Sequence, residues 1–251
     1  EVCIINSLIT FYAKCGLLLE ACGIFQKIPI QDIVSWNALI SGYLDNGCGM
    51  EALQCFRQLQ EKGILGDSGT FVFALKACSI IGATVESQDI HTFICMKGLE
   101  TDLIISNAII EVYAKCGFLV ESKQLIGNVP IQSTVLWNTL LAGYVEHGFS
   151  SEALQCFEQM EDNGILSSNA SFTCCLKACG STANFDKGLE IHGNISLRGL
   201  EMDLLVGSTV VDMYVKCGSL HEALVVFEKL PHRDVVSWNA LLGGYSSQGK
   251  T

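Results

Sequence analysis

The sequence is poor in charged residues and in proline, and it has no long hydrophobic run. Charged residues make up 16% of its 251 residues, apolar residues make up 49%, and only three prolines are present. A disordered tail would need many charges and few apolar side chains, so this composition excludes one. The longest uncharged stretches, such as 124–145, are interrupted by glycine, asparagine and hydroxyl side chains. We therefore expect no membrane span.

Basic residues are also scarce. The chain has 15 Lys and Arg against 26 Asp and Glu, which gives a net charge of −11. A surface that binds nucleic-acid phosphates normally shows a basic excess. Any nucleic-acid-binding function must therefore account for this acidic total.

No motif of a metal site or of a catalytic site is present. The 13 cysteines contain no C-x-x-C, and the tightest group is Cys174, Cys175 and Cys179, with His192 as the nearest histidine. Buried small hydrophobes in a reducing compartment fit this spacing better than zinc ligands or disulfides. The zinc deaminase signature, the P-loop and the nucleophile elbow are all missing. We therefore expect no cofactor and no enzymatic activity.

The most informative feature is an internal repeat. The strings VSWNALI, VLWNTLL and VSWNALL begin at Val34, Val135 and Val236, and are 101 residues apart each time. The string YAKCG, with its variant YVKCG, returns at the same spacing. Every landmark keeps this period without an insertion, which is typical of a repeat architecture.

Each repeat contains shorter units of two helices. The segment 37–44 carries apolar residues at helical spacing, and 47–56 places alanine and phenylalanine at helical spacing just after a glycine. Gly63 and Gly164 stand where glycines end helices. Helix pairs of 31 to 35 residues cannot bury their apolar faces alone. We therefore predict an all-α chain, a right-handed α-solenoid superhelix of helix-turn-helix repeats with a concave groove lined by the first helix of each pair.

The residues that carry this pattern resemble a known family. The phrases VSWNALISGYLDNG, EALQCFRQLQEKGI and NAIIEVYAKCGFLVESKQL look like the pentatricopeptide repeat (PPR) family. More narrowly, they resemble its land-plant PLS subclass, which alternates standard, long-variant and short motifs. The resemblance covers essentially the whole chain and implies seven complete motifs and one partial motif. Their ranges are 2–32, 33–67, 68–102, 103–133, 134–168, 169–203, 204–234 and the partial 235–251.

The resemblance implies a function in binding single-stranded RNA. Members of the family bind one base per motif, through the fifth residue and the last residue. The second residue wedges between bases, and a lysine near the end of the first helix approaches a phosphate. The implied base-reading residues are Asn6 with Asp32, Asn37 with Asp67, Asn107 with Ser133, Asn138 with Ser168, Ser208 with Asp234, and Asn239. The implied wedges are Val34, Ile104, Val135, Leu205 and Val236, and the implied phosphate contacts are Lys14, Lys115 and Lys216.

The hydrogen-bonding inventory of these side chains makes the implied reading sensible. An ionised aspartate only accepts hydrogen bonds, so it suits the ring N–H of uracil or guanine, whereas serine can donate to the ring nitrogen of cytosine. In the family pattern, asparagine at the fifth place favours pyrimidines, and serine or threonine favours purines. The long-variant motifs, with Val72 and Thr173 at the fifth place, often depart from this pattern. The implied target is therefore 5′-UUNYYNGY-3′.

Other roles stay open for several of these residues. The repeated asparagines, and the aspartates or serines before each helix pair, could cap helices. The lysines could instead stabilise the C-terminal ends of their helices by interacting favourably with the helix dipole. We interpret Trp36, Trp137 and Trp238 as packing residues and the two periodic histidines as structural.

The alternative function is a protein-interaction scaffold of the tetratricopeptide type. Such a repeat has the signature W-x2-L-G-x2-Y, which is absent here, although the acidic total favours the alternative. The PLS resemblance instead implies RNA editing or other RNA processing in a mitochondrion or chloroplast, with editing-complex proteins as further partners. Because the chain opens on Glu1 without a basic leader, we expect any transit peptide to lie outside it. The resemblance also implies that any catalytic region lies outside this chain.

Overall fold

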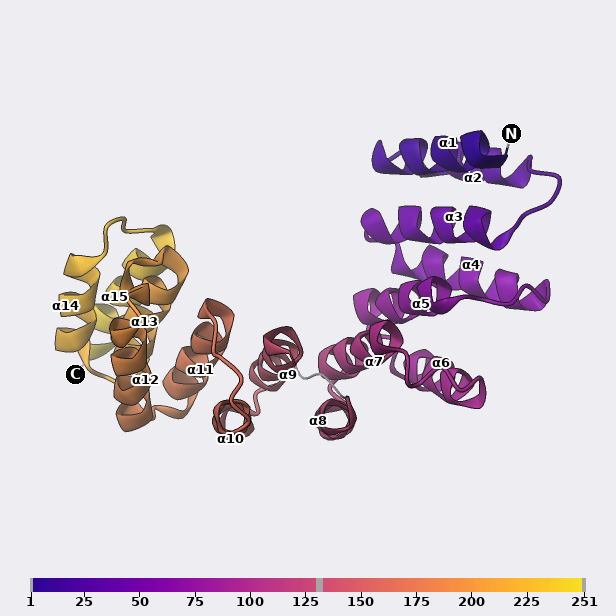
Figure 1. Ribbon diagram of the computed structural model, residues 1–251. Coiled ribbons are helices and arrows are strands. Elements are labelled where there is room, and N and C mark those ends of the chain that lie inside the picture. The colour runs from indigo at the N-terminus through magenta and orange to yellow at the C-terminus, as the bar shows by residue number, and fades with distance from the viewer. Residues whose placement is uncertain (1, 130–132, 250–251) are drawn as a thin grey trace. The chain divides into compact units, whose positions relative to one another are not determined.

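The described part of the chain is entirely helical. A computed structural model describes residues 2–129 and 133–249, and these contain fifteen α-helices, one short 3-10 helix and no strand (Figure 1). The prediction of an all-α chain is therefore confirmed. None of the described helices is both long enough and apolar enough to cross a membrane. The chain divides into two compact units, 1–129 and 130–251.

The N-terminal unit consists of helical hairpins stacked in chain order (Figure 1). Its helices are α1 (Val2–Lys14), α2 (Leu18–Gln26), α3 (Ile33–Asp45), α4 (Gly49–Glu61), α5 (Ser68–Ile81), α6 (Thr84–Met96), α7 (Leu103–Cys116) and α8 (Leu119–Asn128). Helices α1, α3, α5 and α7 pack against one another in turn and form one layer. We call them, with their counterparts in the other unit, the first helices, and their hairpin partners the second helices.

The C-terminal unit repeats the same arrangement. Its helices are α9 (Thr134–Glu146), α10 (Ser150–Asp162), α11 (Asn169–Thr182), α12 (Phe185–Leu197), the 3-10 helix η1 (Leu200–Met202), α13 (Leu204–Lys216), α14 (Leu220–Lys229) and α15 (Val235–Gln248). The first helices α9, α11, α13 and α15 again pack in turn. In both units each first helix begins at the residue where the register places the start of a motif.

The turns between helices depend on glycine in the left-handed region. Gly63 and Gly164 follow second helices with φ of 70° and 71°, as the sequence predicts for residues that end helices. Gly16 has φ of 76° between α1 and α2. A side chain with a Cβ is strained at such angles, so these glycines fix where each hairpin turns.

Two of the three tryptophans are buried, and the third packs but is half exposed. Trp36 is 1% exposed and lies edge-on to Phe25, with 4.6 Å between ring centroids, and Trp137 is also buried. Trp238 makes the equivalent contact with Phe227 at 4.8 Å but is 49% exposed. It lies on α15, and no helix among the described residues follows α15 to cover it.

The cysteines are free thiols, and only some of them are buried. Cys55, Cys78, Cys156, Cys175 and Cys179 lie in the core. Burial raises the pKa of both Cys55 and Cys78 to about 12, so these thiols are unreactive. Cys3, Cys15 and Cys95 are exposed. In the group Cys174, Cys175 and Cys179, Cys175 and Cys179 are buried as predicted, and Cys174 is partly buried. Across residues 2–129 and 133–249, no group of His, Cys, Asp and Glu could hold a metal ion.

The two periodic histidines join consecutive hairpins. His91 Nδ1 lies 2.7 Å from the Tyr113 hydroxyl, and His192 Nδ1 lies 2.9 Å from the Tyr214 hydroxyl. Burial lowers the pKa of each imidazole, which favours the neutral form. Each pair ties a second helix to the next first helix, which agrees with the structural role predicted for them.

Candidate nucleic-acid interface

The last residue of each motif caps the first helix of the next. Asp32, for example, accepts a hydrogen bond from the backbone N–H of Ser35 at 2.9 Å, and Asp234 accepts one from Ser237 at 2.8 Å. An acceptor here satisfies one of the backbone donors that an α-helix leaves free at its start. The residues that cap in this way are Asp32, Asp67, Asp102, Ser133, Ser168, Asp203 and Asp234.

The asparagines of the two standard motifs do not cap helices; they reach the next capping residue instead. Asn37 lies inside α3, and its Nδ2 donates to Asp67 Oδ1 at 3.1 Å. Asn138 lies inside α9, and its Nδ2 donates to Ser168 Oγ at 2.9 Å. In each unit the structure therefore brings together one pair of residues that the sequence predicts to read a base.

The short motifs 2–32 and 204–234 do not form such pairs among the described residues. Asn6 Oδ1 is buried without a hydrogen-bond partner, and Asn6 is not hydrogen-bonded to its expected partner, Asp32. Asn107 Oδ1 is also buried without a partner among the described residues, and its expected partner Ser133 belongs to the other unit. Ser208 is 2% exposed, and its hydroxyl donates to the carbonyl of Leu204 at 2.7 Å. Its hydroxyl is thus engaged within α13 and does not reach Asp234.

In the long-variant motifs the side chains at the base-reading positions are buried or already hydrogen-bonded within the protein. Val72 is buried, and Thr173 is buried with its hydroxyl donating to the Asn169 carbonyl at 2.7 Å. Asp102 uses one carboxylate oxygen for the N–H of Ile104, at 2.8 Å, and the other for the Ser68 hydroxyl, also at 2.8 Å.

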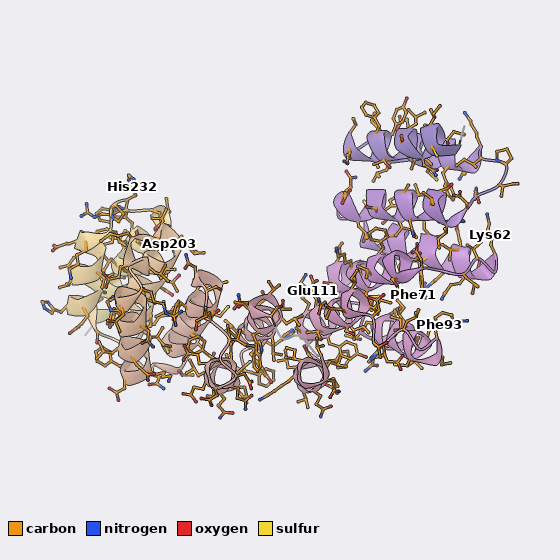
Figure 2. The ribbon with its side chains drawn as sticks, viewed as in Figure 1. Lys62, Phe71, Phe93, Glu111, Asp203 and His232 are labelled. Atoms are coloured by element: carbon orange, nitrogen blue, oxygen red, sulfur yellow. The ribbon has the colours of Figure 1, made fainter. Side chains whose placement is uncertain are left out.

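Asp203, labelled in Figure 2 at the start of α13, likewise has both carboxylate oxygens hydrogen-bonded within the protein. One of its oxygens accepts from the N–H of Val206 at 3.0 Å, and the other accepts from Asn169 Nδ2 at 2.9 Å. Every carboxylate oxygen of these two aspartates therefore already accepts a protein hydrogen bond.

Aliphatic side chains stand exposed at the second position of five motifs. All of them lie in the first turn of a first helix, and each is between 56% and 71% exposed. They are Val34, Ile104, Val135, Leu205 and Val236. Beside Val34 and Asn37 the surface is hollowed by about 280 Å³, between residues of α1, α3 and α5 that include Thr10, Asp45 and Phe73.

Charge is distributed unevenly between the two helix layers. The first helices carry four acidic residues (Asp45, Glu111, Glu146, Asp212) and five basic ones (Lys14, Lys76, Lys115, Lys177, Lys216). The second helices carry fourteen acidic residues and four basic ones. Most of the net charge of −11 therefore belongs to the second helices, not to the layer that holds the asparagine pairs.

The three predicted phosphate contacts lie at the ends of first helices and are exposed. Lys115 Nζ pairs with Glu111 on the same helix at 2.8 Å; Glu111 is labelled in Figure 2. Lys216 Nζ pairs with Asp212 at 2.7 Å. A phosphate at either lysine must compete with a neighbouring carboxylate, which weakens its contribution to binding.

The sequence does not predict the role of one pair of residues at this interface. Thr70 and Ser171 occupy the third position of the motifs that follow Asn37–Asp67 and Asn138–Ser168, and both are fully buried. Thr70 Oγ1 lies 2.8 Å from Asn37 Oδ1, and Ser171 Oγ lies 2.5 Å from Asn138 Oδ1. The available signal was the capping-box spacing, in which a polar side chain at the third helical position returns a hydrogen bond to the cap.

Acid is expected to weaken the cap at Asp32. Hydrogen bonds from the Ser35 side chain and backbone hold the pKa of Asp32 below its ordinary 3.8, so its carboxylate stabilises the fold above that value. The stabilisation is lost as the pH falls through the lowered pKa. Asp32→Ala should therefore cost about 1 kcal/mol at pH 7. Urea denaturation at pH 7 and at pH 3 should show this gap narrowing in acid; an equal gap at both values would contradict the assignment.

The sequence matches known repeats over much of its length. Residues 31–79 and 132–181 match the PPR repeat family, and residues 4–31, 208–235 and 236–251 match the PPR repeat. Among similar Arabidopsis thaliana proteins, the pentatricopeptide repeat-containing protein At2g33680 is 34% identical over 99% of this chain. The mitochondrial protein At3g09040 is 35% identical over 96%, and the chloroplastic protein At4g25270 is 34% identical over 96%. This chain spans 34%, 23% and 46% of their respective lengths.

Solved structures share the fold. The crystal structure of PPR10 in complex with an 18-nt psaJ RNA element superposes with a TM-score of 0.80, at 19% identity, over 97% of this chain and 37% of that one. PPR10 from maize superposes with a TM-score of 0.74 over 100% of this chain and 40% of that one. The stacked hairpins of this chain, its asparagines paired with capping residues, and its repeat matches all agree. The chain belongs to the pentatricopeptide repeat family.

Proposed function

We propose that the chain is a sequence-specific module for single-stranded RNA, which reads one base per motif with the target 5′-UUNYYNGY-3′. The observation that carries this proposal is a polar pair in each unit, Asn37–Asp67 and Asn138–Ser168, hydrogen-bonded on the first-helix layer. An exposed valine lies three residues before each asparagine. The chain also shares its fold with PPR10, which was solved in complex with an RNA element, and this supports RNA binding.

The second base of the target has the clearest chemistry. Burial raises the pKa of Asp67, but the hydrogen bonds from Thr70 and Asn37 outweigh burial, so the pKa lies below its ordinary value. The ionised carboxylate accepts on Oδ1 from Thr70 and Asn37, and Oδ2 accepts only a longer contact of 3.4 Å from Asn37. Oδ2 is thus available to the N3–H of uracil. Cytosine, with a lone pair at N3, would face this oxygen unfavourably.

The space beside this pair suits one base. The hollow of about 280 Å³ next to Val34 and Asn37 is slightly smaller than the sites of about 300–1,000 Å³ that hold drug-sized ligands. Its aliphatic edge at Val34 can lie against the flat face of a base, and its polar edge at Asn37, which is hydrogen-bonded to Asp67, can meet the base edge.

The unspecified positions of the target also have a physical basis. Asp102 and Asp203 have both carboxylate oxygens engaged, and the fifth residues Val72 and Thr173 are buried. In neither long-variant motif does the fifth residue offer a free hydrogen-bonding group to a base, which supports N at positions three and six. The G at position seven has the least support, because the Ser208 hydroxyl is engaged within its own helix.

The uneven charge answers the objection raised by the acidic total. The first helices have one more basic than acidic residue, whereas the second helices have ten more acidic than basic residues. With the five capping aspartates, Asp32, Asp67, Asp102, Asp203 and Asp234, the first-helix layer carries nine acidic and five basic residues. RNA on this layer would thus meet a much smaller acidic excess than on the second helices. The acidic total was the feature that favoured a protein-interaction scaffold, and most of it lies outside this layer.

The cellular role follows from the relatives. Several similar proteins are named mitochondrial or chloroplastic, so we place this chain in an organelle. The PLS register adds RNA editing or other RNA processing as the outcome, with editing-complex proteins as partners. By family and fold the chain itself is a repeat protein and not an enzyme.

A titration tests the proposal directly. Fluorescence anisotropy at one fixed salt concentration should show the chain binding 5′-UUACCAGU-3′ about tenfold or more tightly than a shuffled RNA of equal composition, since several mismatches add. Fixed salt is needed because the phosphate contribution depends steeply on it. Equal affinity for the two RNAs would refute sequence-specific binding.

A further inference from the structure

Ser171 lies directly beneath the pair Asn138–Ser168. It is the third residue of α11, is fully buried, and contacts both members of the pair. Its hydroxyl lies 2.5 Å from Asn138 Oδ1, 3.2 Å from Ser168 Oγ and 3.0 Å from the backbone nitrogen of Ser168. Because a buried hydroxyl cannot give its proton to solvent, these three neighbours decide where the proton goes.

Counting donors settles the direction of the Ser171 hydroxyl. The Ser168 N–H can only donate, so Ser171 Oγ accepts it. The single Ser171 proton must then go to an oxygen, and the Asn138 carbonyl oxygen at 2.5 Å is much nearer than Ser168 Oγ at 3.2 Å. The Ser171 hydroxyl therefore donates to Asn138 Oδ1.

That donation fixes the orientation of the Asn138 amide and, through it, the Ser168 hydroxyl. With Oδ1 held by Ser171, the amide Nδ2 donates to Ser168 Oγ at 2.9 Å. The Ser171 N–H also donates to Ser168 Oγ, at 3.4 Å. Both lone pairs of the Ser168 oxygen are thus engaged by protein donors, so its hydroxyl can only donate, either to Ser171 Oγ at 3.2 Å or to a ligand.

We propose that Ser171 is a positioning residue that keeps the Ser168 hydroxyl a donor and thereby makes motif 134–168 prefer cytosine over uracil. The inference rests on the proposed RNA-binding function. Cytosine presents a lone pair at N3 and can accept from Ser168, whereas uracil presents N3–H and cannot. Without the Ser171 hydroxyl, the amide of Asn138 is free to turn over. Ser168 can then donate to Asn138 Oδ1 and offer a lone pair to uracil.

Two other motifs of the same chain provide internal comparisons. Thr70 occupies the equivalent place beneath Asn37–Asp67. Asp67, however, is ionised, so its carboxylate can only accept hydrogen bonds, however the Thr70 hydroxyl is oriented. The preference for uracil at the second base therefore does not need the Thr70 hydroxyl. Beneath Ser133 the third residue is Leu136, which has no hydroxyl. The fourth base should thus be read as a pyrimidine with little distinction between C and U.

The test measures base preference, not overall affinity. The full 251-residue chain is titrated with RNAs that carry C or U at the fifth base or at the second base. The wild type should bind C at the fifth base about fivefold more tightly than U, the value of one neutral hydrogen bond. Ser171→Ala should bring this ratio close to one. Ser171→Thr, which keeps the hydroxyl, should retain it, and Thr70→Val should keep the uracil preference at the second base.

Controls separate positioning from a general loss of structure. Ser151→Ala makes the same change on α10, a second helix, and should leave both ratios as in the wild type, and circular dichroism should show equal helix content in all variants. If Ser171→Ala keeps the fivefold ratio, the positioning role is overturned while RNA binding stands. A wild type that prefers uracil at the second base but is indifferent at the fifth also overturns it. A wild type indifferent at both positions refutes the proposed function itself.

Discussion

Replacing Ser168 by aspartate is expected to change the base preferred by motif 134–168 from cytosine to uracil. The substitution reproduces on α9 and α11 the arrangement of Asn37 with Asp67, in which one carboxylate oxygen accepts only a 3.4 Å contact from the asparagine and is available to a base. A donor toward cytosine N3 becomes an acceptor toward uracil N3–H. If each matched hydrogen bond contributes about 1 kcal/mol, the ratio of C to U affinity should change about 25-fold.

The measurement compares four RNAs that differ only at the fourth and fifth bases. Ser133→Asp should add a smaller change of about fivefold at the fourth base, where the wild type distinguishes C from U only weakly, so the double variant prefers uracil at two adjacent positions. Ser151→Asp adds the same charge on α10, away from the first-helix layer, and should lower affinity slightly for all RNAs alike. An unchanged ranking of bases in Ser168→Asp would show that the assigned register is wrong, even if overall affinity falls.

The sequence allows the fold and the positions of the pairs to be predicted because both depend on local, periodic features. Gly63 and Gly164 end helices through backbone angles that other residues adopt only with strain, so their spacing alone marks the hairpins. Asp67 and Ser168 stand immediately before helices, where an acceptor side chain has one obvious use. Such features need no knowledge of the neighbouring repeat.

What the sequence does not reveal depends on contacts between neighbouring hairpins. Ser208 follows the family pattern, yet its hydroxyl bonds back to Leu204 and the residue is buried. Trp238 has the same sequence context as Trp36 but is half exposed, because burial is decided by the next helix in the stack. Thr70 and Ser171 look like ordinary capping residues until their distances to the asparagine of the preceding motif are known.

Replacing Asp45 and Glu146 together by lysine is expected to raise RNA affinity strongly and without regard to sequence. Both residues are exposed and end first helices, α3 and α9, at the place where α1 and α13 end with Lys14 and Lys216. The change removes two negative charges and adds two positive ones near the bound strand. A lysine also suits the C-terminal end of a helix dipole, so the fold should not suffer.

The salt dependence of binding distinguishes local phosphate contacts from a mere change of net charge. Two new phosphate contacts should steepen the slope of log affinity against log salt by about 1.4, and affinity at low salt should rise about tenfold or more. Glu61→Lys with Asp162→Lys makes the same charge change at the ends of α4 and α10, both second helices, and should alter the slope much less. Equal slopes in the two double variants would mean that RNA does not lie along the first helices. A steeper slope only for the Asp45 and Glu146 variant would place the phosphates at the C-terminal ends of the first helices.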